Sequence, residues 1–147
     1  IIINHMKKDL SKFLEFTPYK PAKGEKYMTS KQITHFKTIL VRWKELLMKE
    51  ADKTMVHMKN DSTKLADPND AATQEEEFRL ELRTRDRERK LIRKIDQALQ
   101  RVDDGFYGFC EDTGEPIGIK RLEARPIATL CIEAQERHER MEKTQVD

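Results

Sequence analysis

Cysteine, glycine and aromatic residues are all scarce in this sequence. It has two cysteines and five glycines, and aromatic side chains make up 7% of the chain. So few cysteines exclude a framework of structural disulfides, and we expect the two that are present to be free thiols or the remnant of a metal site. No glycine-rich phosphate loop and no pair of nucleophile and base appears, so the sequence predicts no catalytic residues and no enzyme.

Long hydrophobic runs and a strong net charge are also missing. No apolar stretch approaches the ~18 residues that a membrane span needs, and we recognise no secretory signal, so we expect a cytoplasmic protein without membrane contact. The formal net charge of +2 is too small to indicate DNA binding by itself. Charged residues of both signs nevertheless make up 38% of the chain, which is typical of a long solvated coiled coil.

An acidic stretch, residues 65–77, separates two long helical patterns. Asp67 followed by Pro68 is typical of a helix start, with aspartate as the N-cap and proline at the first helical position. Upstream, Thr29 and Gln32 have the spacing of a capping box. The residues after it place apolar side chains at intervals of three and four, as one face of a helix requires: Ile33, Phe36, Leu40, Trp43, Leu47, Ala51, Met55 and Met58.

The second helical pattern ends at Gly105, which we predict to be a left-handed C-cap. Arg85 and Arg89 take positions where the helix seam would favour apolar groups. The apolar positions of this pattern are Phe78, Leu82, Leu91, Ile92, Ile95, Leu99 and Val102. Because two helices of matched length joined by a short link pack antiparallel, we predict a mainly α fold with a long antiparallel coiled-coil hairpin over residues 29–105, its tip near 60–72.

The hairpin is too charged to supply a large core, so we expect it to project from a small globular domain. Residues 1–6 resemble a cloning remnant and are left out of the fold. Residues 7–28 are predicted to pack on the globular base. Residues 106–128, rich in glycine and aromatics, are predicted to form a zinc-finger-like knuckle, and residues 129–147 a C-terminal helix.

Charge is distributed unevenly along the second helix, between Glu75 and Lys94. Acidic residues dominate towards the tip and basic residues towards the root. One interpretation is a solvated face with ion pairs four residues apart, such as Glu75 with Arg79 and Glu81 with Arg85. The other is functional: an acidic end suits a cationic or metal-containing cavity, and a basic root suits an anion.

The two cysteines begin two halves of a degenerate metal-binding frame. Cys110 and Thr113 stand where one C-x2-C pair would be, and Cys131 and Ala134 where the other would be. Threonine and alanine supply no thiolate, while structural zinc needs four ligands. Asp112 or His138 would have to complete the set. We predict instead a zinc-ribbon shape held by packing, with no metal, and a disulfide between the cysteines remains a second use for them.

Four runs of sequence, residues 67–78, 81–92, 117–126 and 130–132, carry a resemblance to a known family. They are similar to the DksA family of bacterial transcription factors, and the likeness extends over nearly everything from Tyr19 onward. The halved cysteine frame resembles the zinc-independent paralogue type of this family, in which threonine and alanine stand at the same two positions.

The resemblance implies a function and a set of tip residues. Proteins of this family bind RNA polymerase by inserting the coiled coil through the secondary channel, destabilise open complexes at ribosomal RNA promoters and potentiate guanosine tetraphosphate (ppGpp) in the stringent response. The family's tip residues correspond to Asp67, Asp70 and Ala72. For the two aspartates, helix capping is the structural alternative, and it is compatible with the functional role.

The resemblance also implies a ppGpp pocket formed together with the polymerase. Its residues here are Leu91, Lys94 and Arg125, with Arg87 nearby. Where zinc-containing relatives have a lysine, this chain has Gln135, so we expect ppGpp potentiation to be retained but weaker. The expected co-regulator is therefore ppGpp, the expected partner is RNA polymerase, and the protein is expected to be a monomer.

Two other classes of function are kept as alternatives. The tip carboxylates are also suited to holding a metal for RNA cleavage, as in the Gre transcript-cleavage factors, which use a similar coiled coil, or to competing for the same channel. The knuckle is an alternative site for sequence-specific DNA binding, against which the weak net basicity argues.

Overall fold

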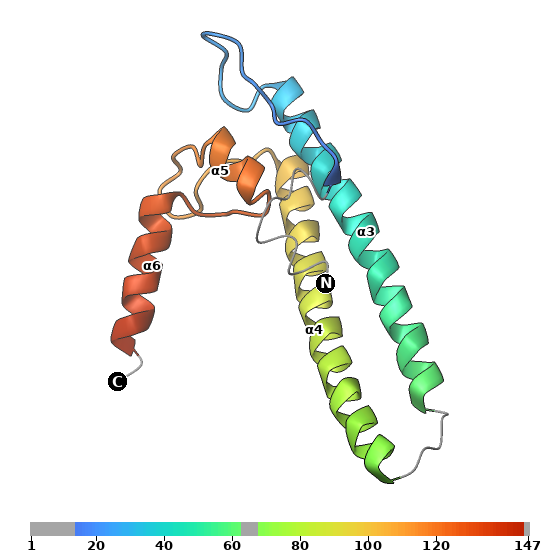
Figure 1. Cartoon of the computed structure of the whole chain (residues 1–147). Helices are drawn as coiled ribbons and strands as arrows, with labels where there is room; N and C mark the ends of the chain where they lie inside the picture. Colours follow the sequence, from blue (N-terminus) through green and yellow to red (C-terminus); the bar gives the residue numbers. More distant parts are fainter. Residues whose placement is uncertain (1–13, 63–67, 146–147) are drawn as a thin grey trace. The chain divides into compact units, whose positions relative to one another are not determined.

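The computed structural model describes residues 14–62 and 68–145. Helix α3 spans Ser30–Ser62, α4 spans Pro68–Asp104, α5 spans Ile119–Ala124 and α6 spans Ile132–Gln145 (Figure 1). An isolated antiparallel bridge joins Phe109 to Pro116. The prediction of a mainly α fold with a long helical hairpin and a small helical C-terminal region is confirmed. No helix in the described part of the chain combines the length and the apolar character of a membrane span.

The chain divides into two compact units. Residues 43–96 contain the parts of α3 and α4 next to their connection, and we call them the hairpin unit. The described residues on either side, 14–42 and 97–145, form the base unit.

Charged pairs fix the register of the hairpin unit. Lys44 Nζ lies 2.6 Å from Asp96 Oδ1, and His57 Nδ1 pairs with Glu81 Oε1 nearer the connection. In both pairs the residue numbers add to about 139, as two antiparallel helices in constant register require. Figure 1 shows α3 and α4 running side by side in opposite directions.

The apolar seam of the hairpin unit is shorter than the sequence pattern predicted. Trp43, Leu47 and Ile95 are buried, with exposed fractions of 5%, 0% and 0%. Three predicted seam residues nearer the connection are largely exposed: Met55 at 36%, Phe78 at 39% and Leu82 at 40%. The reason is geometric, because two helices alone cover only a narrow stripe of each other, and the described residues of the hairpin unit include no third helix that covers the rest.

The helix seam also contains a charged residue that the pattern did not predict. Of the two predicted arginines, Arg85 is half-buried and Arg89 is exposed, whereas Glu88 is buried at 4% exposure. A shift of one residue turns a helix by about 100°, which is enough to exchange a solvated side chain for a buried one.

Helix α3 begins with the cap that the sequence predicted, with one difference. The backbone N–H of Gln32 donates to Thr29 Oγ1 at 3.4 Å. The Gln32 side chain, which is buried, accepts from the N–H of Met28 at 2.6 Å and donates to the carbonyl of Lys26 at 2.9 Å. Gln32 therefore holds the turn before the helix instead of closing a capping box on Thr29.

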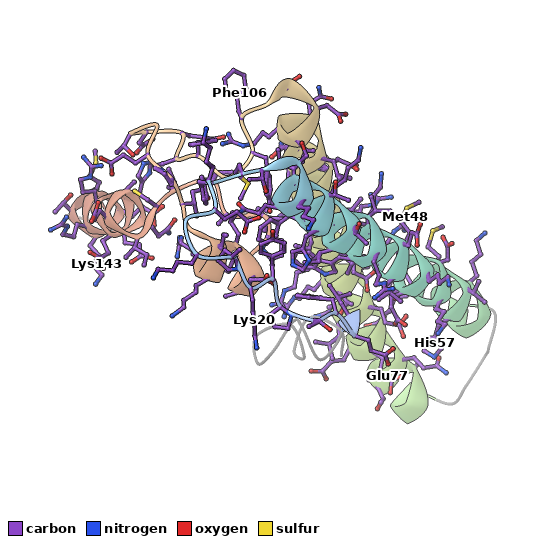
Figure 2. The ribbon with its side chains drawn as sticks, turned by 90° about the horizontal axis from the view of Figure 1, so that it is seen from above. Lys20, Met48, His57, Glu77, Phe106 and Lys143 are labelled. Carbon is purple, nitrogen blue, oxygen red and sulfur yellow. The ribbon has the colours of Figure 1, made fainter. Side chains whose placement is uncertain are left out.

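Gly105 ends α4 as predicted. Its φ of 84° is left-handed, its N–H donates to the carbonyl of Val102, and the N–H of Phe106 donates to the carbonyl of Arg101. These two bonds are those of a Schellman motif. Phe106, the next residue, is 66% exposed and points into solvent (Figure 2).

The core of the base unit joins the first part of α3 to the knuckle. Phe36 is fully buried, and its ring centroid lies 5.9 Å from that of Tyr107. Tyr107 is buried as well, and its hydroxyl donates to the carbonyl of Pro126 at 2.7 Å. Tyr27 connects the segment before α3 to the same knuckle, because its hydroxyl donates to the carbonyl of Gly108 at 2.6 Å and accepts from the N–H of Gly118 at 3.0 Å.

Candidate functional site

The predicted tip residues lie at or beside the start of α4. The helix begins at Pro68, as the Asp-Pro pair predicted. Asp67 lies outside the described residues, and Asp70 is described only as part of the first turn of α4. Ala72 is exposed on α4. Because the side chain of Ala72 is a single methyl group, a partner surface is able to approach the helix backbone closely.

The carboxylates that follow the tip stay in solvent. Glu75, Glu76 and Glu77 are exposed, and Glu75 Oε2 lies 4.0 Å from Arg79 NH2. The predicted Glu75–Arg79 pair is therefore present, although an exposed pair at this distance contributes little to stability. Glu81 was predicted to pair with Arg85 on its own helix, but it pairs with His57 across the hairpin.

Three of the four residues assigned to ppGpp share one face of α4. Arg87, Leu91 and Lys94 are spaced by four and three residues, which places them on successive turns. Arg87 and Lys94 are exposed and Leu91 is half-buried. Arg125 is exposed at the C-terminal cap of α5, where its backbone N–H donates to the carbonyl of Arg121 at 2.7 Å. It belongs to the base unit, so the set of four stays a prediction.

Glu88 is a buried acid that the sequence did not single out. Its Oε2 is buried and has no hydrogen-bond partner in the described part of the chain. Burial raises the pKa of Glu88, and the negative charge of Glu50 on α3 raises it further. The charged form of Glu88 is therefore the one that folding disfavours.

Replacing Glu88 with glutamine is expected to stabilise the protein at neutral pH by about 1 kcal/mol, because the change removes a buried negative charge whose Oε2 has no hydrogen-bond partner among the described residues. The pKa of Glu88 is higher in the folded than in the unfolded chain. Its contribution to the free energy of unfolding is therefore most favourable below the ordinary pKa of glutamate and is lost as the pH rises through the folded-state pKa. Urea unfolding from pH 5 to 8 measures this. The advantage of Glu88→Gln should grow with pH, whereas the exposed control Glu76→Gln should show no such trend.

The four positions of the degenerate cysteine frame meet in the base unit. Cys110 and Cys131 are free and buried, at 4% and 7% exposure, and Ala134 is fully buried. Thr113 is exposed, and its Oγ1 lies 4.0 Å from Cys131 Sγ. Ala134 stands at the fourth position of the frame, so a buried methyl group is found where a zinc finger would have a ligand.

Cys110 lies in a surrounding of hydrogen-bond donors. Burial raises the pKa of its thiol, but hydrogen bonds from the Thr113 side chain and from the backbone of Cys131, Thr113 and Asp112 outweigh it and lower the pKa to about 6. Such donors stabilise negative charge on sulfur, which is why the pKa falls although burial acts in the other direction.

The residues of the frame do not fit a structural zinc ion. Asp112 and His138, the two residues that would have to complete the ligand set, are exposed and pair with each other, with His138 Nε2 lying 2.6 Å from Asp112 Oδ2. Among the described residues, no three His, Cys, Asp or Glu side chains are grouped so as to hold a metal. A tetrahedral zinc site needs four ligands, and this frame offers two thiolates.

A histidine on α3 makes contacts that the sequence did not indicate. His35 Nε2 lies 2.9 Å from Glu123 Oε1, which also accepts from the N–H of Tyr19 at 2.6 Å. The ring of His35 contacts the rings of Phe16 and Tyr19, and all three line a cavity of about 600 Å³. No sequence signal joins residues 88 positions apart, so only the folded chain reveals this contact.

Two family models match the chain, and together they cover most of it. One is described as "DnaK suppressor protein DksA, N-terminal domain" and matches residues 32–102. The other is described as "Prokaryotic dksA/traR C4-type zinc finger" and matches residues 105–140.

Curated relatives and a solved structure match over similar lengths. A protein of Caulobacter vibrioides named RNA polymerase-binding transcription factor DksA is 52% identical over 134 residues, which are 91% of this chain and 94% of the relative. The protein of the same name from Escherichia coli K12 is 51% identical over 126 residues, 86% of this chain and 83% of the relative. The structure of transcription factor DksA2 from Pseudomonas aeruginosa has a TM-score of 0.77 and 38% identity, covering 90% of this chain and 98% of that one.

Proposed function

This chain belongs to the DksA family of transcription factors, and from that premise we propose that it binds RNA polymerase and regulates transcription. The observation that carries the proposal is the 52% identity to a relative named for polymerase binding, over 94% of that relative's length. Membership of a family of transcription factors confirms the prediction that the chain is not an enzyme.

The hairpin unit is the part that we propose enters the secondary channel of the polymerase. Two helices in fixed register form a stiff element, and the exposed acidic residues after the tip carry negative charge along it. Asp67, Asp70 and Ala72 then approach the active centre, where catalytic metal and substrate give a strongly charged surrounding. The consequence is destabilisation of open complexes, most visibly at ribosomal RNA promoters.

The exposed cations on α4 support a role for ppGpp as co-regulator. Arg87 and Lys94 are exposed, as contact with a polyphosphate requires, and Leu91 lies between them on the same face. A guanidinium also binds phosphate oxygens in a bidentate manner, which suits Arg125. Gln135 brings no charge, and its amide donates to Glu139 at 3.2 Å. We therefore propose that ppGpp deepens inhibition, but less than in relatives with a lysine at this position.

The chain is proposed to act without zinc, as a paralogue of the zinc-independent type. The core of the base unit around Phe36, Tyr107 and Leu122, which are 0%, 3% and 0% exposed, supports a fold that is stable without a metal. Dialysis against a strong zinc chelator is expected to leave the far-ultraviolet circular dichroism, the melting temperature and the inhibition of transcription unchanged. A loss of any of the three on chelation, restored by added zinc, would contradict this.

Single-round transcription from a ribosomal RNA promoter tests the proposed function. Purified protein is added to the cognate polymerase with and without ppGpp, and a promoter that forms long-lived open complexes serves as the control. The proposal expects inhibition at the first promoter only, deepened by ppGpp. Inhibition that is equal at both promoters would overturn it.

A backtracked elongation complex separates the proposal from transcript cleavage of the Gre type. We expect the protein to release no short RNA fragments from it, while a Gre factor added in parallel does. A gel shift with promoter DNA alone should show no complex, because we propose that the protein reaches promoters only when it is bound to the polymerase. We propose that it does so as a monomer in the cytoplasm.

A further inference from the structure

Two exposed methionines on α3 have no role in the sites at the tip, at the root or in the knuckle. Met48 is 49% exposed and Met55 is 36% exposed, and Figure 2 shows Met48 pointing from α3 into solvent. They are seven residues apart, which is two helical turns, or about 10 Å, along one line of the helix. Ala51 is half-buried and lies between them on the same face. We call Met48, Ala51 and Met55 the methionine stripe, and all three belong to the hairpin unit.

The methionine stripe interrupts a charged surface. Lys49, Asp52 and Lys53, which are its neighbours along α3, are all exposed. A single exposed apolar side chain is ordinary in a folded protein, but two that are aligned along one face of a helix form a surface that can pack against a partner. Methionine suits such a surface, because its unbranched thioether adapts to the shape of what it meets.

The proposed function names the partner that would cover the methionine stripe. If the hairpin unit enters the secondary channel of the polymerase, Met48 and Met55 enter with it, since they lie on the same two-helix arm. Their side chains then leave water and pack against the channel wall. Burial of apolar surface favours this step, so the two thioethers contribute to the affinity for the polymerase.

The exposed thioethers are open to oxidation by a hydroperoxide. With hydrogen peroxide, the sulfur lone pair attacks one peroxide oxygen, an S–O bond forms while the O–O bond breaks, and the second oxygen leaves as water. Sulfur loses two electrons and the peroxide gains two. The product is methionine sulfoxide, a polar side chain that disrupts apolar interfaces. Burying it without a hydrogen-bond donor is unfavourable.

We propose that Met48 and Met55 are sites of reversible oxidation, and that their sulfoxides weaken the binding of the hairpin unit to the polymerase. This rests on the proposed function, because the stripe has to be buried by the polymerase for its polarity to matter. The free protein keeps its fold on oxidation, since both side chains are already in contact with solvent. Methionine sulfoxide reductases restore the thioethers, one enzyme for each epimer of the sulfoxide.

Peroxide treatment of the full chain tests the proposal. Untreated protein is first shown to bind core polymerase, in competition with labelled wild-type protein. Hydrogen peroxide is then added until mass spectrometry shows both sulfoxides, and circular dichroism is expected to remain unchanged. We expect affinity for the polymerase to fall at least about tenfold. A thiol reductant reverses disulfides and sulfenic acids but leaves methionine sulfoxide, so it should not restore binding, whereas the two reductases should.

Leucine variants separate the methionine stripe from other oxidisable groups. Leucine is close to methionine in volume and resists oxidation, so Met48→Leu combined with Met55→Leu should bind polymerase equally well before and after peroxide. Met141→Leu is the matched control, because Met141 is 60% exposed but lies on α6 in the base unit. This control should stay as sensitive as the wild type.

The outcomes distinguish this proposal from the proposed function. Untreated protein that does not bind polymerase would contradict the proposed function itself. Where untreated protein binds, three results would overturn the role of the methionine stripe: full affinity with both sulfoxides present, an equal loss of affinity in the double leucine variant, or recovery with the thiol reductant alone.

Discussion

Asp70→Asn is expected to weaken the inhibition of a ribosomal RNA promoter at least about tenfold while the protein still binds polymerase. Asparagine has nearly the shape of aspartate, so the substitution removes a charge in the first turn of α4 and costs the helix only about 0.3–1 kcal/mol through the lost interaction with its dipole. Little water surrounds a polymerase active centre. The loss of one carboxylate charge there costs several times more interaction energy than the same loss in solvent. We expect at least about a tenfold increase in the concentration of protein needed for half-inhibition, equivalent to about 1.4 kcal/mol.

Asp52→Asn is the matched control for this experiment. Asp52 is an exposed carboxylate on α3 of the hairpin unit, away from the tip. Its substitution also replaces a carboxylate with an amide, but at a site that we do not expect to reach the active centre. It should inhibit like the wild type. Binding of each variant is measured by competition with labelled wild-type protein for core polymerase. The proposed role of the tip would be wrong if Asp70→Asn inhibited normally, or if it lost inhibition only because it no longer bound.

Gly108→Ala is expected to destabilise the base unit by about 2–3 kcal/mol. Gly108 has a φ of 90°, and a Cβ built on it would lie 2.8 Å from Met28 Sδ and 3.2 Å from Tyr27 Oη. The left-handed backbone costs an alanine about 1–2 kcal/mol, and the displacement of two neighbours adds to that cost. Urea unfolding followed by circular dichroism gives the change in free energy.

Gly105→Ala separates the two contributions. Gly105 has a similar φ of 84° but nothing within 4 Å of the added Cβ, so its substitution measures the backbone cost alone. We expect Gly108→Ala to be the more destabilising of the two. Combining Gly108→Ala with Met28→Ala should recover part of the difference, because the truncated side chain no longer meets the new methyl group. Equal effects of the two glycine substitutions would show that close packing at Gly108 contributes nothing.

Local signals made the long helices predictable from the sequence. Thr29, Pro68 and Gly105 act through bonds and dihedral angles within four residues of themselves, so their effect is readable without the fold. The apolar spacing of Leu47 and Ile95 is equally local. The short helix α5 was not predicted, because six residues give too little periodicity to detect.

Pairings between distant residues were not predictable in the same way. Glu81 had an arginine four residues away, and only the packed hairpin shows that His57 is its partner. Asp112 and His138 were considered as zinc ligands because of their chemistry, whereas the fold pairs them with each other. In both cases the actual partner lies where sequence spacing carries no information.

The constant register of the hairpin unit makes its length adjustable. Residues facing each other across α3 and α4 have numbers that add to about 139, as Lys44–Asp96 and His57–Glu81 show. Removing seven residues from each helix at facing positions, 53–59 and 80–86, would therefore shorten the arm by about 10 Å and preserve the facing surfaces on either side of the cut. The length of the hairpin and the chemistry of its tip are therefore able to change independently of each other in evolution.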